Sequence, residues 1–122
     1  MQHGVAAPDG HTIHITGQVA WDADGQVLHA GDAKAQTHAA LDHVERILAD
    51  AGGTLDDLVS MTTYLIDRSD WPKISAARAE RFTEEFGPVS TAIQVAGLAE
   101  PALLVELQCT AVIPTDRFLP TD

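Results

Sequence analysis

The feature that most constrains the fold of this chain is an alternation in the segment Leu103–Ile113, where every second residue is apolar and those between Val105 and Ala111 are polar. The apolar residues of the alternation are Leu103, Val105, Leu107, Cys109, Ala111 and Ile113. The residues between them include Glu106, Gln108 and Thr110. Successive side chains of a β-strand point to opposite faces of its sheet. The segment is therefore predicted to be a strand with one buried face and one polar face, and other parts of the chain must cover the buried face.

Further strands are predicted from shorter patterns. Residues 11–16 alternate like the C-terminal segment, with Ile13 and Ile15 on one side. The segment Leu58–Ile66 is rich in β-branched and aromatic residues, which are typical of strands. We also expect short strands at 26–28 and 91–95, and leave open a further strand before Asp9.

Two helices are predicted between these strands. Asp32 can cap the first, and the apolar residues between 40 and 51 follow the three-four spacing of an amphipathic helix that ends at Gly52. The second begins at Ser69, with Trp71 as an anchor and a proline in its first turn, and is expected to continue to about Phe86.

These elements predict one α+β domain over residues 1–122, a mixed sheet with two helices packed on one face. Two helices cover only part of one sheet face, so we expect the molecule to form an oligomer through the other face.

Composition excludes several function classes. The chain has 7 Lys and Arg against 18 Asp and Glu, a formal charge of −11, which repels phosphate backbones and makes nucleic acid an unfavourable partner. No apolar run approaches the roughly 20 residues that span a membrane. We see no signal peptide either, and expect a cytoplasmic protein.

Neither the cysteine nor the histidines suggest a metal site. Cys109 falls in the apolar alternation and is expected to be buried. His11 and His14 are three residues apart on a predicted strand and should point to opposite faces. His38 and His43 are separated by about 140° around a helix. No nucleotide-binding or nucleophile motif occurs, so we expect no metal and no cofactor.

Six segments of the chain, in order and at the right intervals, resemble motifs of the RidA (YjgF) family. The resemblance begins with IHITGQVAWDADG, similar to the family's (I/V)x(I/V)SGQxxxDxxG, and includes PVSTAIQVAGL and VELQCTAV, similar to PARSxVxVxxL and xEIExxAV. The six segments are Ile13–Gly25, Gln36–Gly53, Met61–Asp67, Trp71–Phe86, Pro88–Leu98 and Val105–Val112.

This resemblance implies a fold similar to bacillary chorismate mutase and a homotrimer whose sheets form a central barrel. It implies a small-molecule ligand in a cleft between subunits. Members of the best-known branch hydrolyse enamines and imines to ketones or keto acids plus ammonia, and an arginine holds the substrate carboxylate there.

Carried over position by position, the resemblance places different residues at several site positions. The family arginine falls on Ser90, a glutamate of the last strand on Gln108, the helix asparagine on Ser75, and the N-terminal tyrosine on or near His3. Glu106 matches the preceding acidic position of the last strand.

These replacements change the expected chemistry. A serine hydroxyl cannot replace the two charge-assisted bonds of a guanidinium, so carboxylate affinity should fall by about tenfold or more. Gln108 keeps the shape of glutamate but cannot accept a proton. We expect a cleft for a neutral or differently charged ligand, with Ser90, Gln108 and His3 as catalytic candidates. The substrate-binding candidates are Ser90, Thr91, Ser75, Gln108 and Glu106.

Three function classes stay open at this point. The first is an enzyme that hydrolyses an imine or enamine other than a simple imino acid, and the second is a non-catalytic trimer that binds a metabolite. The third is a ribonuclease, which the acidic charge disfavours. Whether Arg78, Arg81 or Arg117 replaces the missing cation is also open.

Overall fold

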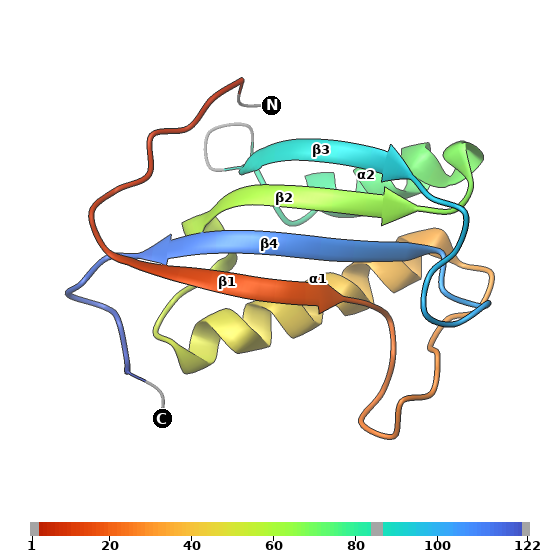
Figure 1. Ribbon diagram of the computed structural model, residues 1–122, viewed down its shortest axis with the longest axis horizontal. Helices are drawn as coiled ribbons and strands as arrows, with labels where there is room; N and C mark the ends of the chain where they lie inside the picture. Colours follow the sequence, from red (N-terminus) through yellow and green to blue (C-terminus); the bar gives the residue numbers. More distant parts are fainter. Residues whose placement is uncertain (1–2, 84–86, 121–122) are drawn as a thin grey trace.

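The computed structural model describes residues 3–83 and 87–120 and contains one four-stranded sheet with two helices on one side (Figure 1). The elements are, in chain order, β1 (His11–Gln18), α1 (Ala33–Asp50), η1 (Leu55–Asp57), β2 (Leu58–Leu65), η2 (Arg68–Asp70), α2 (Trp71–Ala79), β3 (Val89–Gln94) and β4 (Val105–Ile113). The predicted α+β class and mixed sheet are confirmed.

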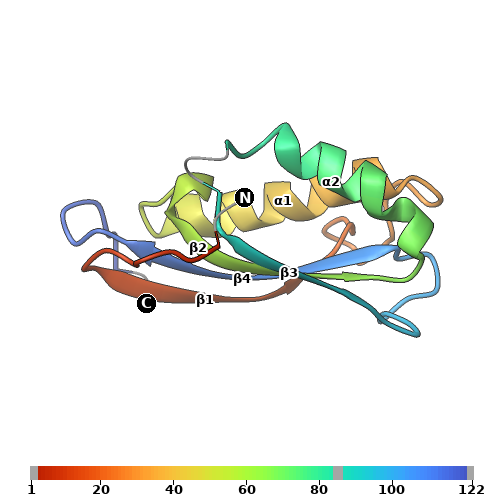
Figure 2. The same cartoon turned by 90° about the horizontal axis from the view of Figure 1, so that it is seen from above.

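The strand order is β1-β4-β2-β3, with β1 and β3 at the edges. Strand β4 runs antiparallel to both β1 and β2, whereas β2 and β3 are parallel. The parallel pair follows from the connection through α2, because a parallel pair needs a crossover, which is usually a helix. Both helices lie on one side of the sheet, and no described element covers the other side (Figure 2). We call this uncovered side the open face.

The core lies between the helices and the sheet. The alternating apolar residues of β4 are all buried, as the sequence predicted, and they pack against apolar residues of α1 that include Leu41, Val44 and Leu48. Asp32 caps α1 by accepting a hydrogen bond from the Ala35 amide, and Gly52 follows the helix with a positive φ of 86°. Cys109 is 2% exposed, which confirms its predicted burial.

Three predictions about local structure are wrong. Residues 26–28 form no strand of the sheet; only a single bridge joins Trp21 to Val27, because the Asp22 carboxylate binds the amides of Asp24 and Gln26 and closes a turn. Ile47 of α1, expected in the buried stripe, is 36% exposed.

The second helix is also shorter than predicted. It ends at Ala79, and Glu80 and Arg81 beyond it form ion pairs with side chains of α1. Phe82 packs against the core although it lies beyond the end of the helix. Phe86, the predicted end of the helix, lies outside the described residues. No helix in the described part of the chain is long and apolar enough to cross a membrane.

Candidate functional site

Gln108 lies near the centre of the open face and contacts Tyr64 of the neighbouring strand. The Tyr64 hydroxyl donates a hydrogen bond to Oε1 of Gln108, with 3.1 Å between the oxygens. Gln108 is paired across the sheet with Thr62, and Thr62 is paired with Thr91, so these three residues share one row of the open face. In the single chain Gln108 is exposed and Tyr64 is half-buried, and the two side chains offer amide and hydroxyl groups to a ligand or to a second subunit.

Glu106 belongs to the next row of the same face. It is paired with Tyr64 and is half-buried, and its carboxylate lies over Gly17 of β1. A Cβ atom at residue 17 would collide with the Glu106 carboxylate, so a glycine there leaves room for this side chain. Among the described residues, Glu106 has no cationic partner. Its carboxylate is therefore available to a substrate or a proton.

Ser90 lies on the other side of the sheet. It is paired with Met61, and Met61 with Cys109, which is buried beneath the helices. Because residues paired across a sheet point to the same face, Ser90 faces the helices while Gln108 faces away from them. Within one chain, Ser90 and Gln108 therefore do not share a site. A site that uses both residues needs two protomers.

Ser75 lines an open pocket of about 290 Å³ between α2 and the chain that leads into β3. The pocket is also lined by Trp71, Arg78, Phe82, Gly87 and Pro88. Ser90 is two residues beyond Pro88 and points to the same side of the strand. The structure thus places Ser75 and Ser90 at one end of the helix-covered side. We call this cavity the α2 pocket.

Arg78 is the cation of the α2 pocket. Its guanidinium carbon lies 5.8 Å from the centre of the Trp71 ring, within the range of a cation–π contact. Desolvation lowers the pKa of Arg78 from its ordinary value, and the Cys109 thiol nearby opposes this shift. The sequence left Arg78 as one of three candidates for the missing cation. No functional role was predicted for Tyr64 from the sequence, although its spacing from Thr62 places both residues on one face of a strand.

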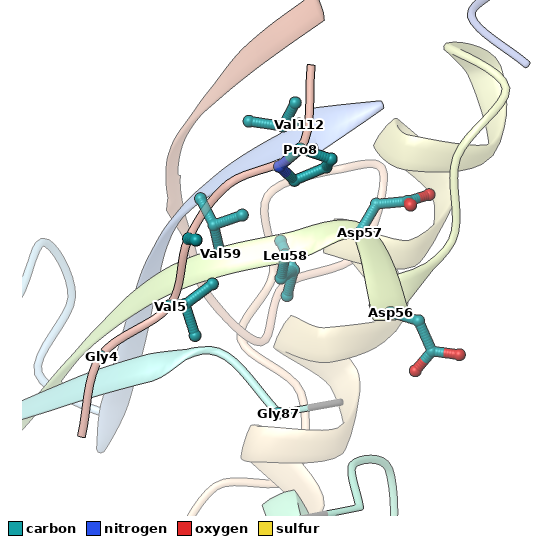
Figure 3. Close-up of a pocket in the computed structure, with 10 residues that line it drawn as sticks. Gly4, Val5, Pro8, Asp56, Asp57, Leu58, Val59, Gly87 and Val112 are labelled. Carbon is teal, nitrogen blue, oxygen red and sulfur yellow. The ribbon is translucent and has the colours of Figure 1, made fainter. Parts of the chain in front are cut away.

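His3 lies in the segment that precedes β1 and runs past the end of the sheet toward the start of β3 (Figure 1). It is exposed, and the residue after it, Gly4, lines a second pocket of about 320 Å³. Figure 3 shows Val5 and Pro8 of this segment beside Val59 and Val112 of the sheet. Gly87 lines this pocket as well as the α2 pocket, so the two cavities adjoin.

Asp57, one of the residues that line this second pocket, has a structural partner. Asp57 binds both terminal nitrogens of Arg117, at 2.9 and 2.7 Å, and accepts a hydrogen bond from the Thr54 amide. Burial alone would raise the pKa of Asp57, but the bonds from Arg117 and Thr54 and the charge of Arg117 hold it below the ordinary value. Arg117 is therefore paired with Asp57 and is not a free cation for a ligand.

The remaining candidate groups also have local partners. His38 lies 2.7 Å from Glu80, His43 lies 2.8 Å from the Trp21 carbonyl oxygen, and the ring of His11 stacks on Phe118. Arg81 is paired with Asp42. In residues 3–83 and 87–120 no group of three His, Cys, Asp or Glu side chains could hold a metal ion.

The fold and these positions define a class: a small α+β protein with one sheet face covered by helices, an open face with polar groups, and a cation in a pocket beside β3. A family model described as Endoribonuclease L-PSP matches residues 2–113. The chain belongs to this family, whose members include proteins named RutC, RidA and YjgF.

Two curated relatives cover most of the chain. A 3-aminoacrylate deaminase RutC of Acinetobacter baylyi is 37% identical over 99 residues, which are 81% of this chain and 77% of the relative. A RutC family protein of Pyrococcus abyssi is 32% identical over 102 residues, 84% and 79% of the two chains.

Solved structures show the same fold. The Rid family protein YyfB of Yersinia pestis superposes with a TM-score of 0.74 at 35% identity, covering 85% of this chain and 80% of that one. RidA of a Psychrobacter species from Antarctica gives a TM-score of 0.77 at 26% identity, with 90% and 93% covered. These comparisons confirm the predicted family and support a role related to the deamination of small imine or enamine metabolites.

Proposed function

We propose that this protein hydrolyses a small enamine or imine, releasing ammonia, in a site formed between subunits of a homotrimer. The observation that carries the proposal is its 37% identity to a 3-aminoacrylate deaminase over 81% of the chain. An enamine of that type carries its nitrogen on the β-carbon of the acid, so it differs from a simple imino acid. Both kinds of substrate carry a carboxylate, so with Ser90 at the position of the family arginine the carboxylate needs another donor.

The reaction would need a proton donor to carbon and a base for water. The α-carbon of the enamine accepts a proton from the Glu106 carboxyl group, which leaves an iminium ion. Water then adds to the iminium carbon and returns a proton to Glu106. A proton moves from the hydroxyl group of the resulting carbinolamine to its nitrogen, the C–N bond breaks, ammonia leaves and a carbonyl group remains. Glu106 suits both steps because it is half-buried, without a cationic partner among the described residues, and on an accessible face.

Gln108 would orient the water or the substrate nitrogen. Its amide group can donate and accept hydrogen bonds at once, and Tyr64 occupies one acceptor position of Oε1. The Nε2 group is then directed to a ligand. Thr91, in the same row, adds a hydroxyl group, and His3 on the N-terminal segment adds an imidazole group that can form hydrogen bonds.

Two features support a site between subunits. Ser90 and Gln108 face opposite sides of the sheet in one chain, and no helix or strand of the described residues covers the open face. A trimer that packs open faces together would cover this side and bring the edge strand β3 of one protomer to the open face of the next. Family resemblance implies the same assembly.

The test compares hydrolysis with and without the protein on a panel of unstable substrates. The panel contains 3-aminoacrylate, prepared by adding ammonia to propiolate, and imino acids generated by an amino-acid oxidase in competition with semicarbazide. We expect acceleration of 3-aminoacrylate loss, followed by its vinyl proton NMR signals, and little effect on the imino acids. Saturable binding without acceleration of any substrate would instead identify a non-catalytic metabolite-binding protein. Cleavage of RNA is not expected, because the charge of −11 opposes binding of a polyanion.

A further inference from the structure

The half-buried cation Arg78 has no acidic partner in the described part of the chain. All 7 Lys and Arg lie within described residues, and Lys34, Lys73, Arg81 and Arg117 form ion pairs. The other two cations without ion pairs, Arg46 and Arg68, are exposed to solvent.

This isolation is unusual in so acidic a chain. The protein has 18 Asp and Glu residues, which are enough to provide a partner for a buried cation. Removing a charge from water without a partner costs several kcal/mol in principle, so partly buried cations are normally paired. The Nε atom of Arg78 is fully buried and has no hydrogen-bond partner in the structure. The protein therefore does not neutralise this guanidinium, and the part of Arg78 that lines the α2 pocket can meet an anion there.

The surroundings of Arg78 favour binding of a small anion. The α2 pocket has a volume of about 290 Å³, near the lower end for small-molecule sites. Trp71 and Phe82 give it apolar walls, and the low polarity of such walls strengthens an ion pair inside. Ser75 lies one helical turn before Arg78 and adds a hydroxyl donor on the same side of the helix.

We propose that Arg78 binds the carboxylate of the substrate in the α2 pocket, and so supplies from α2 the cation that the chain lacks on β3 at Ser90. The proposal rests on the proposed function and specifies its substrate class as an enamino acid. Arg78 and Pro88 line the same pocket, and Ser90 follows Pro88 by two residues on the same side of the sheet, so the guanidinium and Ser90 belong to the same end of the helix-covered side. A guanidinium can bind a carboxylate through two parallel hydrogen bonds, and the two terminal nitrogens form one such edge.

The first experiment measures binding without turnover. Sodium propionate is titrated into the labelled wild-type protein, and the Nε–Hε resonance of Arg78 is followed by NMR. We expect a saturable shift with propionate and none with propionamide or with sodium chloride at the same ionic strength. A shift that is absent, or equal for propionate and chloride, would overturn the assignment of Arg78.

The second experiment measures specificity. Arg78→Gln is compared with Arg68→Gln, which removes the same charge from an exposed site, on 3-aminoacrylate and on its neutral analogue 3-aminoacrylamide. We expect Arg78→Gln to raise KM for the acid by about tenfold or more and to change the values for the amide by less than about twofold. Arg78→Lys should give an intermediate KM, since it keeps the charge and loses the planar fork. Equal losses on acid and amide would contradict the proposal.

The third experiment tests whether Arg78 and Gln108 act from different protomers. Arg78→Gln and Gln108→Ala are each purified, unfolded together in equal amounts and refolded. If a site takes one residue from each of two neighbours in a ring, one site in each mixed trimer is intact, which is about a quarter of all sites when the two variants associate at random, and that share of activity returns. Mixed trimers without recovered activity would show that one chain supplies both residues, contrary to our assignment.

These experiments separate the two proposals. Binding of propionate at Arg78 without acceleration of any substrate would support the anion site and contradict the proposed enzymatic function. Deamination of 3-aminoacrylate at the same rate by the wild-type protein and by Arg78→Gln would support the proposed function and contradict the assignment of Arg78.

Discussion

The hydroxyl group of Tyr64 on β2 donates a hydrogen bond of 3.1 Å to Oε1 of Gln108 on β4. The two residues lie diagonally across the open face, since Tyr64 is paired with Glu106 and Gln108 with Thr62. The bond fixes the carboxamide of Gln108 in one orientation, with its amide nitrogen free for another partner. It also joins the two rows that contain the candidate catalytic groups Glu106 and Gln108.

The first prediction concerns this hydrogen bond. Gln108→Ala should lower kcat/KM for 3-aminoacrylate by about tenfold or more, because the substrate or water loses a polar contact. Tyr64→Phe should lower it less, by about threefold to fivefold, because the carboxamide remains and loses only its orientation. Gln26→Ala, in the exposed turn that precedes α1, is the control. Equal activity of all three variants would contradict a role for this pair.

The second prediction concerns the open face as a subunit interface. Thr62→Arg places a long cation in the middle of this face, and burying that charge against another subunit without a partner is costly. We expect the variant to become monomeric while its circular dichroism remains that of a folded protein. Ala49→Arg, on the exposed side of α1, should leave the trimer intact. Sedimentation velocity measures both. A trimeric Thr62→Arg protein would place the interface elsewhere.

The third prediction concerns a polar residue in the core. Gln36 of α1 is fully buried and binds the Ala102 carbonyl oxygen and the Leu104 amide, at 2.9 and 2.8 Å. Gln36→Ala should lower the free energy of unfolding by about 2–4 kcal/mol, because buried backbone groups lose their partners and a cavity forms. Urea denaturation measures the loss, with the exposed Gln26→Ala as the control. A change within error for Gln36→Ala would show that water replaces these bonds.

The fourth prediction concerns the reactivity of the cysteine. Burial raises the pKa of the Cys109 thiol to about 12, although the charge of Arg78 acts in the opposite direction. At pH 8 only about one thiol in ten thousand is then ionised, compared with roughly a quarter for an unfolded chain with an ordinary pKa of about 8.5. We expect iodoacetamide to leave the native protein unmodified and to alkylate it in concentrated urea, as followed by intact mass. Rapid alkylation of the native protein would contradict this burial.

Part of the fold follows from local patterns. The alternation in Leu103–Ile113 predicted β4 and its buried face, since a strand places every second side chain on one side. Asp32 and Gly52 predicted both ends of α1, because capping depends on residues next to the helix. The end of α2 was not predictable in this way, since Arg81 beyond it is held by Asp42, a residue 39 positions away in the sequence.

The sequence by itself determined the family, the two-layer architecture and the identity of the groups that could do chemistry. Only the tertiary structure decided which of these groups lie together. The pairing of β3 with β2 turns Ser90 toward the helices and Gln108 away from them, and helix packing leaves Arg78 half-buried beside the chain that leads into β3, without an acidic partner among the described residues. Register and helix packing depend on contacts between distant segments, and for that reason no local pattern could have predicted either arrangement.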